Sequence, residues 1–169
     1  MRIFLTILAS IFLLIQCKNY NDSNVQTTLE GENGNKEPLF TLLDASKTKL
    51  NFINVINDSP SMNGLSYESL YNGGGVAIGD LNDDNLPDIY FISNIYSNKL
   101  FINNGDLTFK ESTSISKVKG TGGFPTGVSM VDINADGLLD IYVCKSGDYP
   151  DLDYRRNELY INKGNNAQG

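Results

Sequence analysis

Two short stretches of the sequence combine acidic and amide side chains in one pattern, D-x-N-x-D-x-x-x-D. The first stretch places Asp80, Asn82, Asp84 and Asp88 at positions 1, 3, 5 and 9, and the second places Asp132, Asn134, Asp136 and Asp140 at the same positions. Oxygen ligands, three of them carboxylates, suit a hard cation, and calcium accepts six to eight oxygens in a flexible geometry. We therefore expect two calcium-binding loops.

The residues between these positions also fit a metal-binding loop. Leu86 and Leu138 stand at position 7, which commonly supplies a backbone carbonyl to calcium. Position 6 is Asn85 or Gly137, two residue types that readily take the left-handed conformation of a sharp turn. An EF-hand would place a glutamate at position 12 between two helices, but position 12 is apolar in both stretches, so position 9 closes the loop.

A simpler interpretation of each stretch is a turn without a metal. Aspartate and asparagine side chains often accept hydrogen bonds from their own backbone in tight turns between strands. Two copies in identical register favour the metal-binding interpretation. Asp83 lies at an even position and is replaced by Ala135 in the second copy, so we expect it to face solvent and leave it out of the ligand set.

The acidic stretches belong to a longer internal repeat. Residues Gly75 to Ile92 (GVAIGDLNDDNLPDIYFI) recur as Gly127 to Cys144 (GVSMVDINADGLLDIYVC), at an offset of 52 residues. The match continues from Asn98 to Gly105 (NKLFINNG) and from Asn157 to Gly164 (NELYINKG), at an offset of 59 because the second copy holds a seven-residue insertion. Each full unit contains four short apolar runs between Gly, Asn and Asp turns, which predicts four short antiparallel strands.

Units of this kind, repeated about every 50 residues, are typical of β-propeller blades. In the first unit we expect strands at Val76 to Ile78, Ile89 to Ile92, Leu100 to Ile102 and Leu107 to Phe109. The run Ile89 to Ile92 is apolar on both faces, so both should be covered. The expected fold is all-β, with blade 1 at about residues 73–113, a partial blade 2 at about 125–169 and a leading strand pair within Phe40 to Ile56. Because a propeller needs about 4 to 8 blades, the chain holds an incomplete one.

The chain starts like an exported protein. Met1 and Arg2 precede an apolar run from Ile3 to Ile15, which is shorter than the ~20 residues of a membrane span and typical of a signal peptide. Gln16 and Cys17 follow the run directly, and this resembles a bacterial lipoprotein signal, in which the cysteine is freed by cleavage and acylated. We expect a signal at residues 1–17 with lipidation at Cys17, a flexible tether at 18–38 and the repeat region at 39–169, in a lipoprotein of the outer membrane or cell surface.

Charge and composition exclude several kinds of function. The chain has 20 acidic and 13 basic residues, a formal net charge of -7, and no histidine. The negative charge disfavours nucleic acid as a partner. Without histidine, catalytic triads that need it and histidine-ligated zinc sites are absent. We expect no enzymatic activity within this chain.

At the two acidic loops the sequence resembles the FG-GAP/VCBS repeat family, whose blades are similar to those of the integrin alpha-subunit propeller and carry calcium in D-x-[DN]-x-D-G-x-x-D loops. The resemblance covers roughly Leu39 to the end, with Asn85 in place of the favoured glycine. The string Tyr71 to Ala77 (YNGGGVA) also resembles secreted lipoproteins of Bacteroidetes-type bacteria. The resemblance implies a seven-bladed propeller, calcium ligation by the eight side chains named above, and no catalytic residue.

The expected function is therefore a calcium-binding, envelope-anchored propeller module that binds or adheres to a glycan or protein partner. An alternative is that the segment is the non-catalytic platform of a larger envelope enzyme or polysaccharide-utilisation protein, whose catalytic domain would lie beyond Gly169.

Overall fold

A computed structural model describes residues 38–147 and 151–165 of the chain. The expected signal at 1–17 with its Cys17, and the expected tether up to residue 37, lie outside the described residues. All helices and strands in the described ranges belong to the unit Thr41–Gly169. None of these helices has the length and hydropathy needed to span a bilayer.

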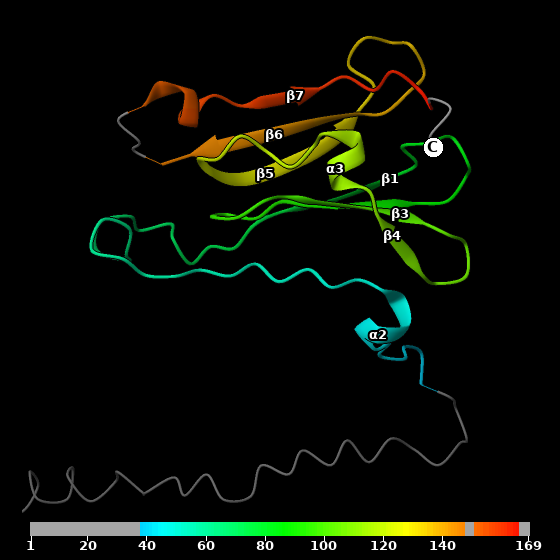
Figure 1. Cartoon of the computed structure of the whole chain (residues 1–169), viewed down its shortest axis with the longest axis horizontal. Helices are drawn as coiled ribbons and strands as arrows, with labels where there is room; N and C mark the ends of the chain where they lie inside the picture. Colours follow the sequence, from blue (N-terminus) through cyan, green and yellow to red (C-terminus); the bar gives the residue numbers. More distant parts are fainter. Residues whose placement is uncertain (1–37, 148–150, 166–169) are drawn as a thin grey trace, which may run out of the picture. The chain divides into compact units, whose positions relative to one another are not determined.

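The first repeat forms a four-stranded antiparallel sheet (Figure 1). Its strands, in spatial order, are β1 (Val76–Gly79), β2 (Asp88–Phe91), β3 (Lys99–Asn103) and β4 (Phe109–Glu111). The expected all-β class and the four strands are confirmed. The fourth strand begins at Phe109 instead of Leu107, because Leu107 takes a φ of 64° in the preceding turn and extended strands require negative φ.

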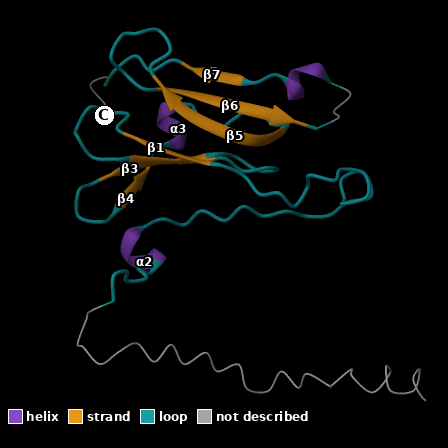
Figure 2. Cartoon of the chain, turned by 180° about the vertical axis from the view of Figure 1, so that it is seen from behind, coloured by secondary structure: helices purple, strands orange, loops and turns teal. Residues whose placement is uncertain are grey.

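The second repeat forms a three-stranded antiparallel sheet within the described residues (Figure 2). Its strands are β5 (Phe124–Val131), β6 (Asp140–Ser146) and β7 (Glu158–Tyr160). The seven-residue insertion lies between β6 and β7 and includes the 3₁₀ helix η1 (Leu152–Arg155). Two single-turn helices, α2 (Ala45–Thr48) and α3 (Thr113–Ser116), complete the elements, and the described residues form no closed propeller.

The two sheets pack face to face, and the core lies between them (Figures 1 and 2). The buried core cluster consists of Tyr90, Ile92, Leu100, Val118, Ile141 and Val143. Burying an aliphatic or aromatic side chain of this size contributes roughly 1.5–3 kcal/mol. The approach of β1 to the second blade leaves little room at Gly79, where a Cβ would lie 2.7 Å from Leu139 Cδ1 in the second loop and 3.0 Å from Met130 Sδ of β5. One blade therefore completes the core of the other.

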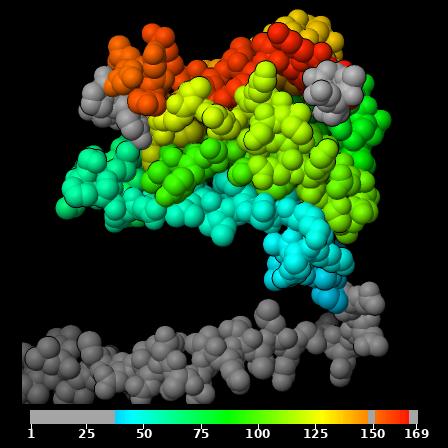
Figure 3. All heavy atoms as spheres, viewed as in Figure 1, coloured from blue at the N-terminus to red at the C-terminus, as the bar shows by residue number. Residues whose placement is uncertain are grey.

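The expected strand pair within Phe40 to Ile56 is wrong. Residues 41–58 form α2 and then an extended segment without strand pairing. The segment lies along the first sheet (Figure 3). On the outer face of that sheet, the ring of Phe52 stacks on that of Phe91, with the ring centroids 4.7 Å apart. A segment on a sheet face meets side chains, not the backbone groups of a free edge, so no ladder forms. The expected covering of β2 on both faces is confirmed, since Tyr90 faces the other sheet.

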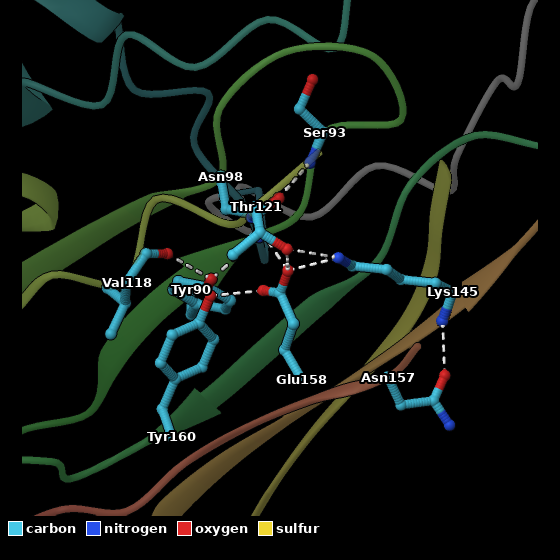
Figure 4. A network of polar contacts seen from close by, with 9 residues as sticks. All are labelled: Tyr90, Ser93, Asn98, Val118, Thr121, Lys145, Asn157, Glu158 and Tyr160. Atoms are coloured by element: carbon cyan, nitrogen blue, oxygen red, sulfur yellow. Dashed lines mark hydrogen bonds and ion pairs between the residues drawn. The ribbon is translucent and has the colours of Figure 1, made fainter. Parts of the chain in front are cut away.

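A polar network joins the second sheet to the linker between the two sheets (Figure 4). Lys145 of β6 forms an ion pair with Glu158 of β7, and their side chains are 0% and 10% exposed. The backbone N–H of Thr121 in the linker donates to Glu158 Oε1 at 2.8 Å, and the Tyr160 hydroxyl donates to Glu158 Oε2. The carboxylate therefore holds the linker against the strands of the second blade.

The ionised form of Glu158 is favoured by this network. Burial raises the pKa of Glu158, but the hydrogen bonds from Lys145, Thr121 and Tyr160 together lower it by more, so the pKa lies below its ordinary value of 4.5. A carboxyl with a lowered folded-state pKa stabilises the fold above its unfolded-state pKa, and this stability is lost as pH falls through the folded-state pKa.

The exchange Glu158→Gln should therefore destabilise the chain at pH 7 by about 3 kcal/mol, because it leaves the buried Lys145 ammonium without its counter-charge. The difference from the unchanged chain should shrink as pH falls below 4.5. Urea unfolding between pH 7 and pH 3 measures both effects. Glu111→Gln, which breaks the exposed Lys99–Glu111 pair, is the matched control and should cost at most about 1 kcal/mol. Equal losses in the two variants would contradict the assignment.

Candidate functional site

Both acidic loops lie at the same end of the two blades (Figure 1). The first loop joins β1 to β2, and the second joins β5 to β6. The left-handed conformation expected at position 6 is confirmed, with φ of 64° at Asn85 and 91° at Gly137. Position 4 is also left-handed, at Asp83 and Ala135, which sequence analysis did not expect. Asp83 is exposed, as expected.

The aspartate at position 1 organises the loop backbone. Asp80 Oδ1 accepts the N–H of position 5 at 3.1 Å, and its Oδ2 accepts the N–H of position 6 at 2.7 Å. Asp132 makes the same two hydrogen bonds, at 3.1 Å and 2.9 Å. The two copies therefore repeat in hydrogen bonding as well as in sequence.

The aspartate at position 9 ties each loop to the third strand of its blade. Asp88 is fully buried, its Oδ2 accepts the N–H of Leu81 at 2.9 Å, and its Oδ1 accepts the N–H of Asn103 at 2.9 Å. Asp140 is equally buried and binds the N–H groups of the equivalent positions at 3.1 Å and 2.7 Å. Because the two N–H groups come from separate segments, this carboxylate closes the loop.

The three carboxylates of the first loop are near enough to repel one another. Burial raises the pKa of Asp88, the hydrogen bonds from Asn103 and Leu81 oppose this, and the charges of Asp84 and Asp80 raise the pKa further. Like charges in one loop are a cost that a bound dication would remove.

The side-chain oxygen of the asparagine at position 3 has different hydrogen bonding in the two loops. In both loops the asparagine amide donates to the position-5 carboxylate at 2.9 Å. Asn82 Oδ1 is buried and accepts no hydrogen bond, whereas Asn134 Oδ1 accepts the N–H of Asp136 at 3.1 Å. A buried acceptor without a donor is costly, and a cation can satisfy it. This unpartnered oxygen is a ligand type that suits a hard cation.

The structure does not gather the carboxylates around a common point. In the described part of the chain, no group of three or more His, Cys, Asp or Glu side chains is close enough to hold a metal ion. The position-5 aspartates instead accept the N–H groups of Leu86 and Leu138, at 2.8 Å and 2.9 Å, which are turn hydrogen bonds. Each carboxylate oxygen keeps a second lone pair, so the donor types fit Ca²⁺ although these oxygens are directed at the backbone.

Sequence analysis missed two pairs of asparagines that support the loops. Asn103 ends β3 and Asn162 lies two residues after β7, and each donates its amide to the backbone carbonyl of position 8 in its own loop, at 3.0 Å and 3.1 Å. Asn98 and Asn157 stand just before β3 and β7. Their side-chain oxygens accept the N–H groups of Ser93 and Lys145, each of which lies five residues after position 9 of its loop. Both pairs recur in the aligned NKLFINNG and NELYINKG strings, which is the signal that could have identified them.

Asp88→Asn should lower the free energy of unfolding by about 2 kcal/mol even without added metal. The new amide group would place a donor against one of the two N–H groups that the carboxylate now accepts, leaving it unpaired in the interior. Chemical denaturation in EDTA measures the loss. Asp83→Asn is the matched control, since Asp83 is exposed, and should change stability by less than about 0.5 kcal/mol. An unchanged stability in Asp88→Asn would exclude the closing role of this carboxylate.

Comparison with protein families matches residues 64–143 to the FG-GAP-like repeat, a range that includes the whole first sheet, both acidic loops and most of β6. Comparison with curated proteins gave no match. The matched repeat is a non-catalytic type of β-propeller blade, in agreement with the two face-to-face sheets. Residues 64–143 of this chain belong to the FG-GAP-like repeat family.

Proposed function

We propose that the two acidic loops bind Ca²⁺ and stabilise the blades. FG-GAP repeats often bind Ca²⁺. The observation that carries the proposal is the buried Asn82 Oδ1, an acceptor without a donor inside a loop of three mutually repelling carboxylates. The side chains at positions 1, 3, 5 and 9 would hold the cation, together with the carbonyl oxygen of Leu86 or Leu138. The cation would supply positive charge where the loop concentrates negative charge.

The module acts, in this proposal, at the cell envelope. The apolar run before Cys17 is typical of an export signal, and Cys17 is the site for a lipid anchor. The sequence alone supports this part of the proposal. An anchored blade module without catalytic residues suits binding or adhesion, with a glycan or protein as partner.

The end of the blades opposite the acidic loops offers a surface for a partner. A cavity of about 380 Å³ is lined by Asn57, Ser59, Met62, Ile95, Gly123 and Tyr154. The Tyr154 side chain is 43% exposed, and Tyr96, whose hydroxyl accepts a hydrogen bond from the Asn57 amide, is 55% exposed. Aromatic rings beside amide and hydroxyl groups suit the amphipathic face of a sugar. We therefore favour a glycan as the partner.

Calcium should raise the melting temperature of the full 169-residue chain relative to EDTA. At about 100 times the Kd, one bound ion adds about 2.7 kcal/mol of stability, because the unfolded chain cannot hold the ligands together. Asp84→Ala and Asp136→Ala should each remove part of this gain, whereas Asp83→Ala should keep it. Calorimetric melting with Ca²⁺, Mg²⁺ and EDTA makes the measurement. A folded chain that melts at the same temperature in Ca²⁺ and EDTA would leave the loops as turns only.

Glycan binding should depend on two exposed tyrosines, Tyr154, which lines the cavity, and Tyr96, which is hydrogen-bonded to the cavity residue Asn57. On a glycan array probed with the full chain, Tyr96→Ala and Tyr154→Ala should each weaken the binding signal roughly fivefold, since a lost aromatic contact costs about 1 kcal/mol. Leu107→Ala removes an exposed apolar side chain in the β3–β4 turn, away from the cavity, and should keep the signal. Binding that both tyrosine variants retain, or an array without any bound glycan, would contradict a glycan site here.

A further inference from the structure

The segment that follows β7 crosses from the second blade to the first acidic loop. The amide of Asn162 donates to the carbonyl oxygen of Leu81 at 2.8 Å, and the amide of Asn165 donates to the carbonyl oxygen of Asn82 at 2.6 Å. Leu81 and Asn82 are positions 2 and 3 of the first loop. Figures 1 and 2 both show the chain after β7 running toward the loop between β1 and β2.

The equivalent residues of the first blade stay within their own blade. Asn103, which aligns with Asn162, donates its amide to Pro87 of its own loop. Asp106, which aligns with Asn165, accepts hydrogen bonds from Thr108 in its own turn. In the described residues, the contact to a neighbouring acidic loop is therefore made by the second copy, which packs against the first.

The loop that receives this contact differs from the loop that does not. Asn82 is half-buried, and its Oδ1 is free of hydrogen-bond donors. Asn134, at the same position of the second loop, is exposed, and its Oδ1 accepts the N–H of Asp136. The backbone of position 3 is fixed by Asn165 in the first loop. In the second loop, the side chain at position 3 instead accepts a hydrogen bond from the backbone of the same loop.

We propose that Asn162 and Asn165 are positioning residues that preorganise the first acidic loop, so that it binds Ca²⁺ more tightly than the second. This inference rests on the calcium binding proposed above. A loop held before the ion arrives loses less conformational freedom on binding, and an oxygen with no competing donor is already available as a ligand. The second loop must first break the hydrogen bond to Asn134 Oδ1. Packing of the second blade thereby sets the affinity of the first blade.

Calorimetric titration of the full chain with CaCl₂ alone tests this. Asp136→Ala leaves the first loop intact and Asp84→Ala leaves the second, so each background reports one site. The Kd of the first loop should be about tenfold lower than that of the second. Adding Asn165→Ala should raise the Kd of the first loop about tenfold and leave that of the second unchanged. Asp106→Ala, at the equivalent position of the first blade, is the control and should change neither Kd.

The outcomes separate this inference from the proposal beneath it. Calcium binding in neither background overturns both. Binding in both backgrounds with equal Kd values, or a first loop indifferent to Asn165→Ala, overturns the inference and leaves calcium binding in place. Asn165→Leu, which keeps the side-chain volume and removes the donor, repeats the test if the alanine variant melts early. Asn165 is exposed, so an effect limited to the first loop reports the lost hydrogen bond.

Discussion

The buried aspartate at position 9 is the constraint on which each blade depends. An ionised carboxylate in the interior is stable only when hydrogen bonds replace its water, and both oxygens of Asp88 accept backbone N–H groups. One group comes from the acidic loop and the other from the end of β3, so the loop, the second strand that starts at Asp88 and the third strand are fixed together. Asp140 repeats this arrangement between the second loop and the segment after β7. The loop conformation is thus part of the sheet.

Packing between blades turns two similar sequences into two different environments. Leu100 is 3% exposed because the second sheet lies over it, whereas Leu159, the aligned residue, is 45% exposed on the outer face of the second sheet. Residues of one repeat are therefore buried by the next repeat and not by their own. The first sheet has its other face covered by Phe52, which takes the place of a neighbouring sheet. Each sheet therefore buries its core face only against a partner layer.

Sequence reasoning succeeded where the repeat expresses local geometry. The spacing of Gly, Asn and Asp between apolar runs predicted the strands, and the choice of Asn85 and Gly137 predicted the left-handed position 6. It failed where a contact is specific to one copy. Glu158 aligns with Lys99, which forms an exposed pair, yet Glu158 forms a buried pair with Lys145 and also accepts a hydrogen bond from Thr121 of the linker. Residues 41–58 have an apolar pattern that predicted strands, but they lie on a sheet face and have no free sheet edge to pair with. The sequence alone does not show where the free edges lie.

The hydrogen bonds accepted by the aspartates at positions 1 and 9 limit how much a bound cation can add to the order of the loops. The carboxylates at positions 1 and 9 accept backbone N–H groups of the loop, so the side chains proposed as ligands also have partners in the protein. This differs from small metal-dependent domains, in which the ligands have no other partners and the chain unfolds without the metal. Calcium in this chain would act on charge, by compensating Asp80, Asp84 and Asp88, and on the single oxygen of Asn82 that the fold leaves unsatisfied. Its contribution is then added stability in a blade that its own carboxylates have already shaped.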